Sequence, residues 1–136
     1  MTQTQWTAVD NYINDLLVLS DSALDATIQS TIDAELPQIN VAPNQGKLLH
    51  ILAQIQGARR ILELGTLAGY STIWLARALP ADGKLITLEA NLKHAEVARE
   101  NIERAGLANI VEIRIGAALD TLPQLATEGQ APFDFV

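Results

Sequence analysis

Two carboxylates flank a glycine-containing turn near the middle of this chain, and their spacing is the pattern in the sequence that most suggests chemistry. Glu63 lies in the apolar run 60–64, which breaks at Gly65 and Gly69 before a helix is expected to begin. Glu89 ends the next apolar segment along the chain. A βαβ nucleotide-binding unit places its glycine turn against the cofactor and an acid at the end of the second strand, where it binds ribose. The pattern therefore predicts a ligand that contains adenosine.

The spacing within the turn indicates which adenosine compound fits best. A dinucleotide site uses Gly-x-Gly-x-x-Gly, which lets the backbone close on a pyrophosphate at the helix start. Here the glycines are Gly65 and Gly69, and Leu67 would crowd a pyrophosphate. S-adenosylmethionine has no phosphate, and its positive charges are attracted to a carboxylate such as Glu63. We therefore expect S-adenosylmethionine, with an NAD(P)-binding oxidoreductase fragment as the first alternative.

Residues 1–57 are expected to form helices and a segment that flanks the cofactor. Apolar residues recur at helical spacing up to a break near Ser20, and then again up to Pro37, which ends the second helix. A third helix is predicted over about 44–56, because Gly57 suits a left-handed helix end.

From Arg59 onward, short apolar strands alternate with amphipathic helices. This alternation is typical of a parallel sheet covered on both faces, so residues 58–136 are predicted to form an α/β, Rossmann-like βαβ half-domain. The expected strands are 60–64, 84–89 and 110–115; the expected helices are 70–79, one that Asn91 caps and Gly106 ends, and one after Gly116.

A fourth apolar segment, 133–136, starts and stops at the end of the sequence. In a doubly wound order it would pair beside the first strand and leave its other edge open. The chain therefore looks like the front half of a larger sheet. An open apolar edge should find a partner, so we expect self-association, most simply as a homodimer; a non-catalytic, self-associating half-domain is the second alternative.

The composition limits the classes of protein to consider. The chain has 136 residues, enough for one domain, and a formal net charge of −7. Nucleic acid and anionic membranes are unlikely partners for such a charge, because both are bound largely through clustered Lys and Arg. There is no cysteine, and the N-terminus lacks the pattern of a signal peptide. A cytoplasmic location is expected.

Four stretches of the sequence resemble one family, the S-adenosylmethionine-dependent O-methyltransferases of the catechol and caffeoyl-coenzyme A type, in their small bacterial form. The stretches are Ile39-Asn40-Val41, the turn 62–72 (Leu-Glu-Leu-Gly-Thr-Leu-Ala-Gly-Tyr-Ser-Thr), Ile86-Thr87-Leu88-Glu89 and Gly116-Ala117-Ala118. The resemblance implies the class I methyltransferase fold and methyl transfer to a phenolic or catechol-like hydroxyl.

The resemblance also implies roles for individual residues. Glu89 would bind both ribose hydroxyls. Glu63 would face the methionine end of the cofactor. Ser71 would hydrogen-bond the carboxylate of the cofactor, and the backbone of Val41 would hydrogen-bond its amino group. The other expected cofactor contacts lie in the turn and after the second and third strands: Gly65, Thr66, Leu67, Gly69, Ala90, Gly116, Ala117, Ala118 and Leu119.

The resemblance further implies a Mg²⁺-type cation and a lysine base, which the family places downstream of the residues present here. Asp134 is not the family's metal-binding acid, so we expect no metal ligand and no catalytic residue in this chain. It would then keep the cofactor half and lack the catalytic half, binding S-adenosylmethionine weakly without efficient transfer.

Other residues are expected to be structural. His50 and His94 lack partners at ligand spacing, and His94 is expected on an exposed helix face beside Lys93. Tyr70 and Trp74 could border a planar substrate but are expected in the core.

Overall fold

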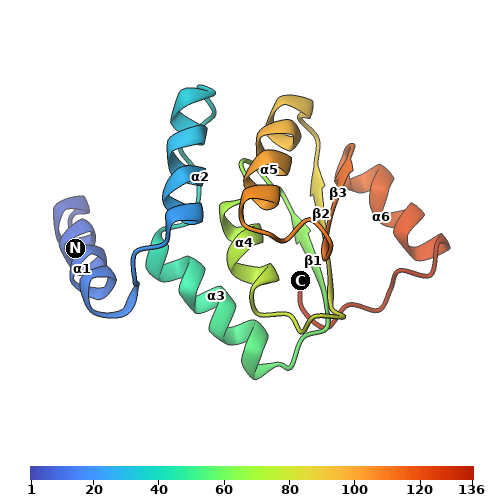
Figure 1. Ribbon diagram of the computed structural model, residues 1–136, viewed down its shortest axis with the longest axis horizontal. Helices are drawn as coiled ribbons and strands as arrows, with labels where there is room; N and C mark the ends of the chain where they lie inside the picture. Colours follow the sequence, from blue (N-terminus) through green and yellow to red (C-terminus); the bar gives the residue numbers. More distant parts are fainter.

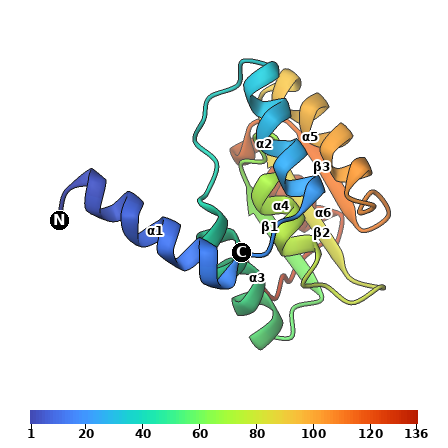
Figure 2. The same ribbon diagram turned by 60° about the vertical axis from the view of Figure 1, so that its left-hand side comes forward.

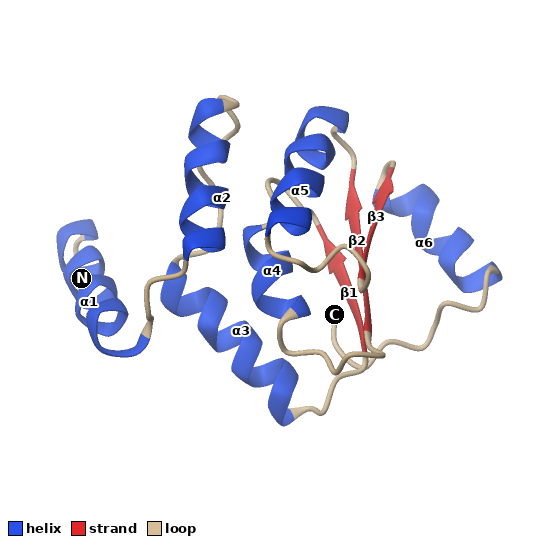
Figure 3. Ribbon diagram, in the orientation of Figure 1, coloured by secondary structure: helices blue, strands red, loops and turns tan.

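Three parallel strands form a sheet in the order β1-β2-β3 in the computed structural model, which describes residues 1–136. The strands are β1 (Arg60–Leu64), β2 (Lys84–Glu89) and β3 (Val111–Ile115) (Figure 3). The helices are α1 (Gln3–Leu17), α2 (Ser22–Asp33), α3 (Pro43–Ile55), α4 (Tyr70–Ala76), α5 (Leu92–Arg104) and α6 (Ala118–Thr127). The predicted α/β, Rossmann-like arrangement is confirmed.

The sheet separates two helical layers (Figure 1). Helices α4 and α5 pack on one side of the sheet and α6 on the other. The strands alternate accordingly, since Ile61 and Leu85 belong to the core beneath α3 and α4, whereas Leu62, Ile86 and Leu88 pack with Leu125 of α6. Both faces of the sheet are thus buried, as expected of a parallel sheet.

The register of the sheet brings the two predicted acids to one edge. Glu63 pairs directly with Thr87, and Leu64 pairs with Leu88, the residue before Glu89. Because β1 and β2 run in the same direction, their carboxyl ends meet at the same edge, where the chain turns into α4 and α5.

The fourth apolar segment lies beside β1, as predicted. Phe135 forms a parallel bridge with Ile61, and the Phe135 carbonyl accepts a 3.0 Å hydrogen bond from the Leu62 N–H. Asp134 strengthens this contact, since its Oδ2 accepts 2.8 Å hydrogen bonds from the N–H groups of Arg59 and Arg60.

Two helix ends differ from the prediction. Helix α4 ends at Ala76 rather than at Leu79, because the N–H groups of Ala78 and Leu79 bond three residues back and tighten the chain into a turn before Pro80. Helix α2 ends at Asp33, well before Pro37.

Helix α1 projects from the rest of the protein (Figure 2). It begins at a capping box in which Thr2 and Gln5 bond reciprocally, and it packs against α3, yet none of its residues is buried. Most of its large apolar side chains are exposed, including Trp6 (49%) and Leu16 (62%). No helix of the chain has both the length and the apolar character needed to cross a membrane.

Candidate functional site

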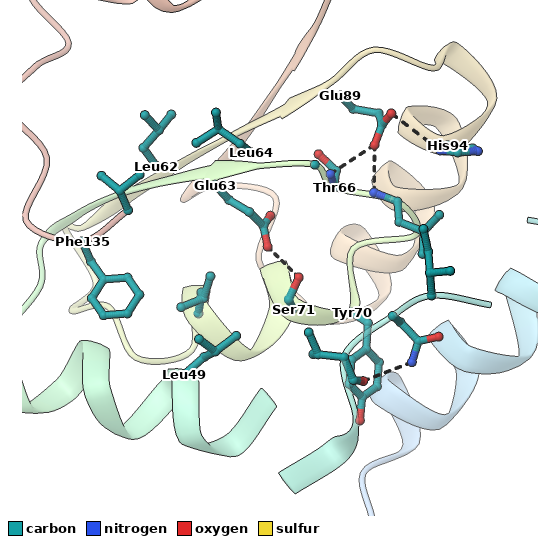
Figure 4. Close-up of a pocket in the computed structure, with 17 residues that line it drawn as sticks. Leu49, Leu62, Glu63, Leu64, Thr66, Tyr70, Ser71, Glu89, His94 and Phe135 are labelled. Carbon is teal, nitrogen blue, oxygen red and sulfur yellow. Dashed lines mark hydrogen bonds and ion pairs between the residues drawn. The ribbon is translucent and has the colours of Figure 1, made fainter. Parts of the chain in front are cut away.

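A pocket of about 500 Å³ opens at the carboxyl edge of β1 and β2 (Figure 4). Its walls come from the connector before α3, the glycine turn, the start of α4 and the end of the chain. The lining residues are Ile39, Asn40, Val41, Leu49, Leu62, Glu63, Leu64, Gly65, Thr66, Leu67, Tyr70, Ser71, Leu75, Glu89, His94, Phe135 and Val136. Most of the wall is apolar, and the two carboxylates supply its acidic groups.

Glu63 is held by three hydroxyl groups. Ser71 Oγ donates to Oε1 at 2.6 Å, while Thr72 Oγ1 and Thr87 Oγ1 donate to Oε2 at 2.6 Å and 2.7 Å. Behind them, Thr66 Oγ1 lies 2.6 Å from Thr87 Oγ1. Hydroxyl groups that donate to a carboxylate stabilise its charged form.

Burial acts on Glu63 in the opposite direction. Desolvation raises the pKa of the Glu63 carboxyl, and the negative charge of Glu89 raises it further, whereas the three hydroxyl donors lower it without cancelling the effect of burial. A pocket-lining acid with a raised pKa has a strong energetic preference for a neighbouring positive charge.

Glu89 is held by backbone groups instead. Its Oε2 accepts hydrogen bonds from the N–H groups of Thr66 (3.1 Å) and Leu67 (2.9 Å), and its Oε1 accepts one from Asn91 (2.9 Å). The side chain is 8% exposed, so Glu89 is not a solvated strand-end acid. Burial would raise the pKa of Glu89, but these donors and His94 outweigh it and lower the pKa.

The glycine turn takes a conformation that directs its N–H groups at Glu89. Gly65 and Gly69 have φ of +93° and +86°, and Leu67 has a left-handed φ of +50°, which is uncommon for a bulky residue. The Leu67 N–H donates one of the hydrogen bonds that Glu89 accepts, and this hydrogen bond stabilises the strained backbone of Leu67.

Seven of the predicted cofactor contacts line the pocket: Val41, Glu63, Gly65, Thr66, Leu67, Ser71 and Glu89. Gly69 is buried beside the pocket as the N-cap of α4, in contact with α5. Ala90 and the segment 116–118 do not line it, although the Gly116 N–H donates to the Glu89 carbonyl (2.9 Å) and so ties the end of β3 to this edge.

Ser71 makes no side-chain cap of α4, since its hydroxyl is bonded to Glu63. The expectation for His94 needs correction. His94 is not on an exposed helix face, because the first turn of α5 directs it back to the strand end; its side chain is 19% exposed, lines the pocket, and places Nδ1 3.6 Å from Glu89 Oε1.

Sequence reasoning also missed the two threonines on Glu63 and the amide of Asn40. Thr72 and Thr87 lie in the quoted motif stretches, and the signal that could have identified Thr87 is its position directly beside Glu63 in the strand register. Asn40 Nδ2 donates to the Val41 carbonyl at 3.2 Å, at the mouth of the same pocket.

This fold defines an α/β protein with a pocket at the carboxyl edge of its parallel sheet, the place where open α/β sheets bind their ligands. A family model described as O-methyltransferase matches residues 17–136, and the chain belongs to this O-methyltransferase family.

The relatives of the chain agree with this assignment. A catechol O-methyltransferase from Niastella koreensis is 60% identical over 129 residues, which cover 95% of this chain and 58% of that relative. The structure of an O-methyltransferase from Bacillus cereus in complex with SAH matches with a TM-score of 0.94 and 56% identity, covering 97% of this chain and 60% of that one. TomG from Streptomyces achromogenes, solved with SAM, gives 0.91 and 50%, covering 98% and 60%. The chain thus spans less than two thirds of these relatives.

Proposed function

We propose that this chain binds S-adenosylmethionine in the pocket at the carboxyl edge of β1 and β2, as the cofactor-binding part of an O-methyltransferase. The observation that carries the proposal is the pair Glu63 and Glu89, two buried or half-buried acids that reach one pocket from neighbouring strands and are held by different donors. The SAH and SAM complexes of two relatives support the choice of ligand.

In this proposal the two acids bind opposite ends of the cofactor. Glu89 accepts from the ribose, because its position is fixed by the turn, and Glu63 attracts the positive charges of the methionine end. The backbone carbonyl of Val41 accepts from the amino group, and Ser71 turns its hydroxyl proton from Glu63 to the cofactor carboxylate when the cofactor binds. The remaining proposed contacts are Gly65, Thr66, Leu67, Gly69, Ala90, Gly116, Ala117 and Ala118.

The two proposed parts of the chain have different roles in binding the cofactor. Residues 1–57 flank the cofactor with helices, and residues 58–136 supply the βαβ half that binds it. The bound cofactor supplies the methyl group for a phenolic or catechol-like hydroxyl, while the residues of this chain bind and orient it.

Mg²⁺ stays a prediction for a longer protein. The structure contains no group of three or more His, Cys, Asp or Glu side chains that could hold a metal ion. The lysine base likewise stays a prediction from the resemblance. A cytoplasmic location also stays a prediction.

Equilibrium dialysis with methyl-labelled S-adenosylmethionine, catechol and Mg²⁺ tests both parts of this proposal. We expect the chain to retain label and to release no methylated catechol. Absence of retained label would overturn the binding site, and efficient turnover would overturn the division between a cofactor part and a catalytic part.

We also propose that the chain self-associates, with a second copy covering the groove between α1 and α3. This groove of about 450 Å³ has an apolar floor that includes Ile13, Leu17, Leu48 and Ile51. Helix α1 carries acidic residues and no Lys or Arg, and Lys47 of α3 is the single cation among the groove-lining residues, which disfavours an anionic membrane as the occupant. A second copy would instead bury equivalent apolar helices against each other in a closed, two-fold contact.

Sedimentation velocity tests the groove as the interface. Leu17→Glu, at a groove-lining side chain that is 57% exposed, should convert a dimer to a monomer, whereas Leu119→Glu on α6, 86% exposed, should leave it dimeric. A dimer that survives Leu17→Glu would place the interface elsewhere, for example at the open edge of the sheet.

A further inference from the structure

The Glu89 carboxylate is nearly saturated with hydrogen bonds from its own chain. A carboxylate offers about four acceptor positions, two on each oxygen. The N–H groups of Thr66 and Leu67 take both positions on Oε2, and the Asn91 N–H takes one on Oε1. One position therefore remains free.

The three occupied positions are not easily vacated. The Thr66 and Leu67 donors belong to the glycine turn, whose backbone is fixed between β1 and α4, and the Asn91 donor belongs to the residue that caps α5. Each donor is a main-chain group; the Thr66 hydrogen bond is buried and those of Leu67 and Asn91 are partly buried, so losing these partners to a ligand is costly, most of all for Thr66.

His94 lies beside Oε1 of Glu89, the oxygen that keeps the free acceptor position. Its Nδ1 lies 3.6 Å from Glu89 Oε1, which is beyond a normal hydrogen bond, and the ring lines the pocket (Figure 4). Its backbone is fixed by the Asn91 cap, because Asn91 Oδ1 accepts from the N–H groups of Lys93 and His94.

A ribose presents two neighbouring hydroxyl groups, and Glu89 has a free acceptor for one of them. We propose that His94 is the second ribose-binding residue: the ribose diol is held between Glu89 and His94 rather than by Glu89 alone. Imidazole suits the task because its nitrogens can donate or accept, so it can bond whichever hydroxyl Glu89 leaves free. This inference rests on the proposed binding of an adenosine cofactor.

Calorimetric titration with S-adenosylhomocysteine and its 2′-deoxy and 3′-deoxy analogues tests the inference. The wild-type chain should lose about three- to tenfold in affinity for the missing hydroxyl that His94 binds and about tenfold or more for the one that the Glu89 carboxylate binds. In His94→Ala, removal of one of the two hydroxyls from the ligand should no longer change the affinity, while removal of the other should weaken binding as much as in the wild type.

Two further variants make the result specific. His94→Asn places polar atoms as many bonds from the backbone as Nδ1 and should restore part of the lost discrimination. Lys93→Ala removes an exposed neighbouring cation and should keep both penalties. If His94→Ala weakens all three ligands by one common factor, His94 contacts no hydroxyl and the inference fails. If the wild-type chain binds none of the three, the proposed function itself fails.

Discussion

Thr87 lies directly beside Glu63 across the pairing of β1 with β2, and its Oγ1 donates a 2.7 Å hydrogen bond to Glu63 Oε2. When Glu63 is ionised, the proton of Thr87 is committed to it, so Thr66 must be the donor in the 2.6 Å contact with Thr87. A chain of hydroxyl groups therefore runs from the glycine turn to the acid in the pocket, and each member fixes the orientation of the next.

Thr87→Val should weaken this network while keeping the shape of the side chain. Thr87 is fully buried, so the loss of its hydroxyl leaves Thr66 and Glu63 each short of a partner, at a cost of about 1–3 kcal/mol in the free energy of unfolding. The pKa of Glu63 should rise further, since one of the donors that lower it is gone. Urea denaturation measures the first effect, and pH-dependent binding of S-adenosylhomocysteine measures the second.

Thr7→Val is the matched control, because Thr7 is exposed on α1 and bonds its hydroxyl only within that helix. A destabilisation of the same size in both variants would show that the Thr87 hydroxyl has no special role.

Glu89 and Glu63 should give stability opposite dependences on pH. The pKa of Glu89 is lowered in the folded protein, so Glu89 stabilises the fold above its ordinary pKa of 4.5, and this contribution is lost as the pH falls through and below that value. The pKa of Glu63 is raised, so its ionisation destabilises the fold at high pH, and the penalty disappears as the pH falls through the raised pKa toward 4.5.

Glu89→Gln and Glu63→Gln separate the two contributions. Subtracting each variant's unfolding curve from that of the wild type cancels the other acids whose pKa values are lowered, such as Asp21 and Glu112. The difference for Glu89→Gln should shrink as the pH falls, and the difference for Glu63→Gln should move in the other direction. Two parallel differences would show that the acids share one environment.

Gly46→Ala should destabilise the protein, although Gly to Ala in a helix usually stabilises it by about 1 kcal/mol. A Cβ atom at Gly46 would lie 2.3 Å from Cδ1 of Trp74, so α3 would have to move away from α4. We expect a loss of about 1–3 kcal/mol in the free energy of unfolding, the range for overpacking. Thermal denaturation should show no such loss for Gln54→Ala, at an exposed position of the same helix; an equal or raised midpoint for Gly46→Ala would contradict this packing.

The sequence predicted the strands and the glycine turn closely because these features are local. An apolar run that ends in a glycine with positive φ, as at Leu64 and Gly65, leaves few alternatives to a buried strand followed by a turn. The same locality explains the failure at Leu79. Residues 76–79 all tolerate a helix, and only the tightened hydrogen bonds before Pro80 show where α4 ends.

The position of His94 in the pocket could not be predicted from helical periodicity alone. Periodicity places His94 on the polar face of α5, but the first turn of a helix that follows a strand points back at the end of that strand. Likewise, the apolar spacing in α1 predicts a helix without saying what covers it, and the structure leaves that face exposed.

The most direct test of the account is a calorimetric titration of the purified chain with S-adenosylhomocysteine, with NAD as the control ligand and Glu89→Ala to locate the site. We predict saturable heat with S-adenosylhomocysteine, none with NAD, and a loss of binding of at least about tenfold in Glu89→Ala, because the ribose acceptor and the turn that it holds are both lost. Heat with NAD alone, or binding of S-adenosylhomocysteine that Glu89→Ala leaves unchanged, would contradict the assignment of this pocket to the cofactor.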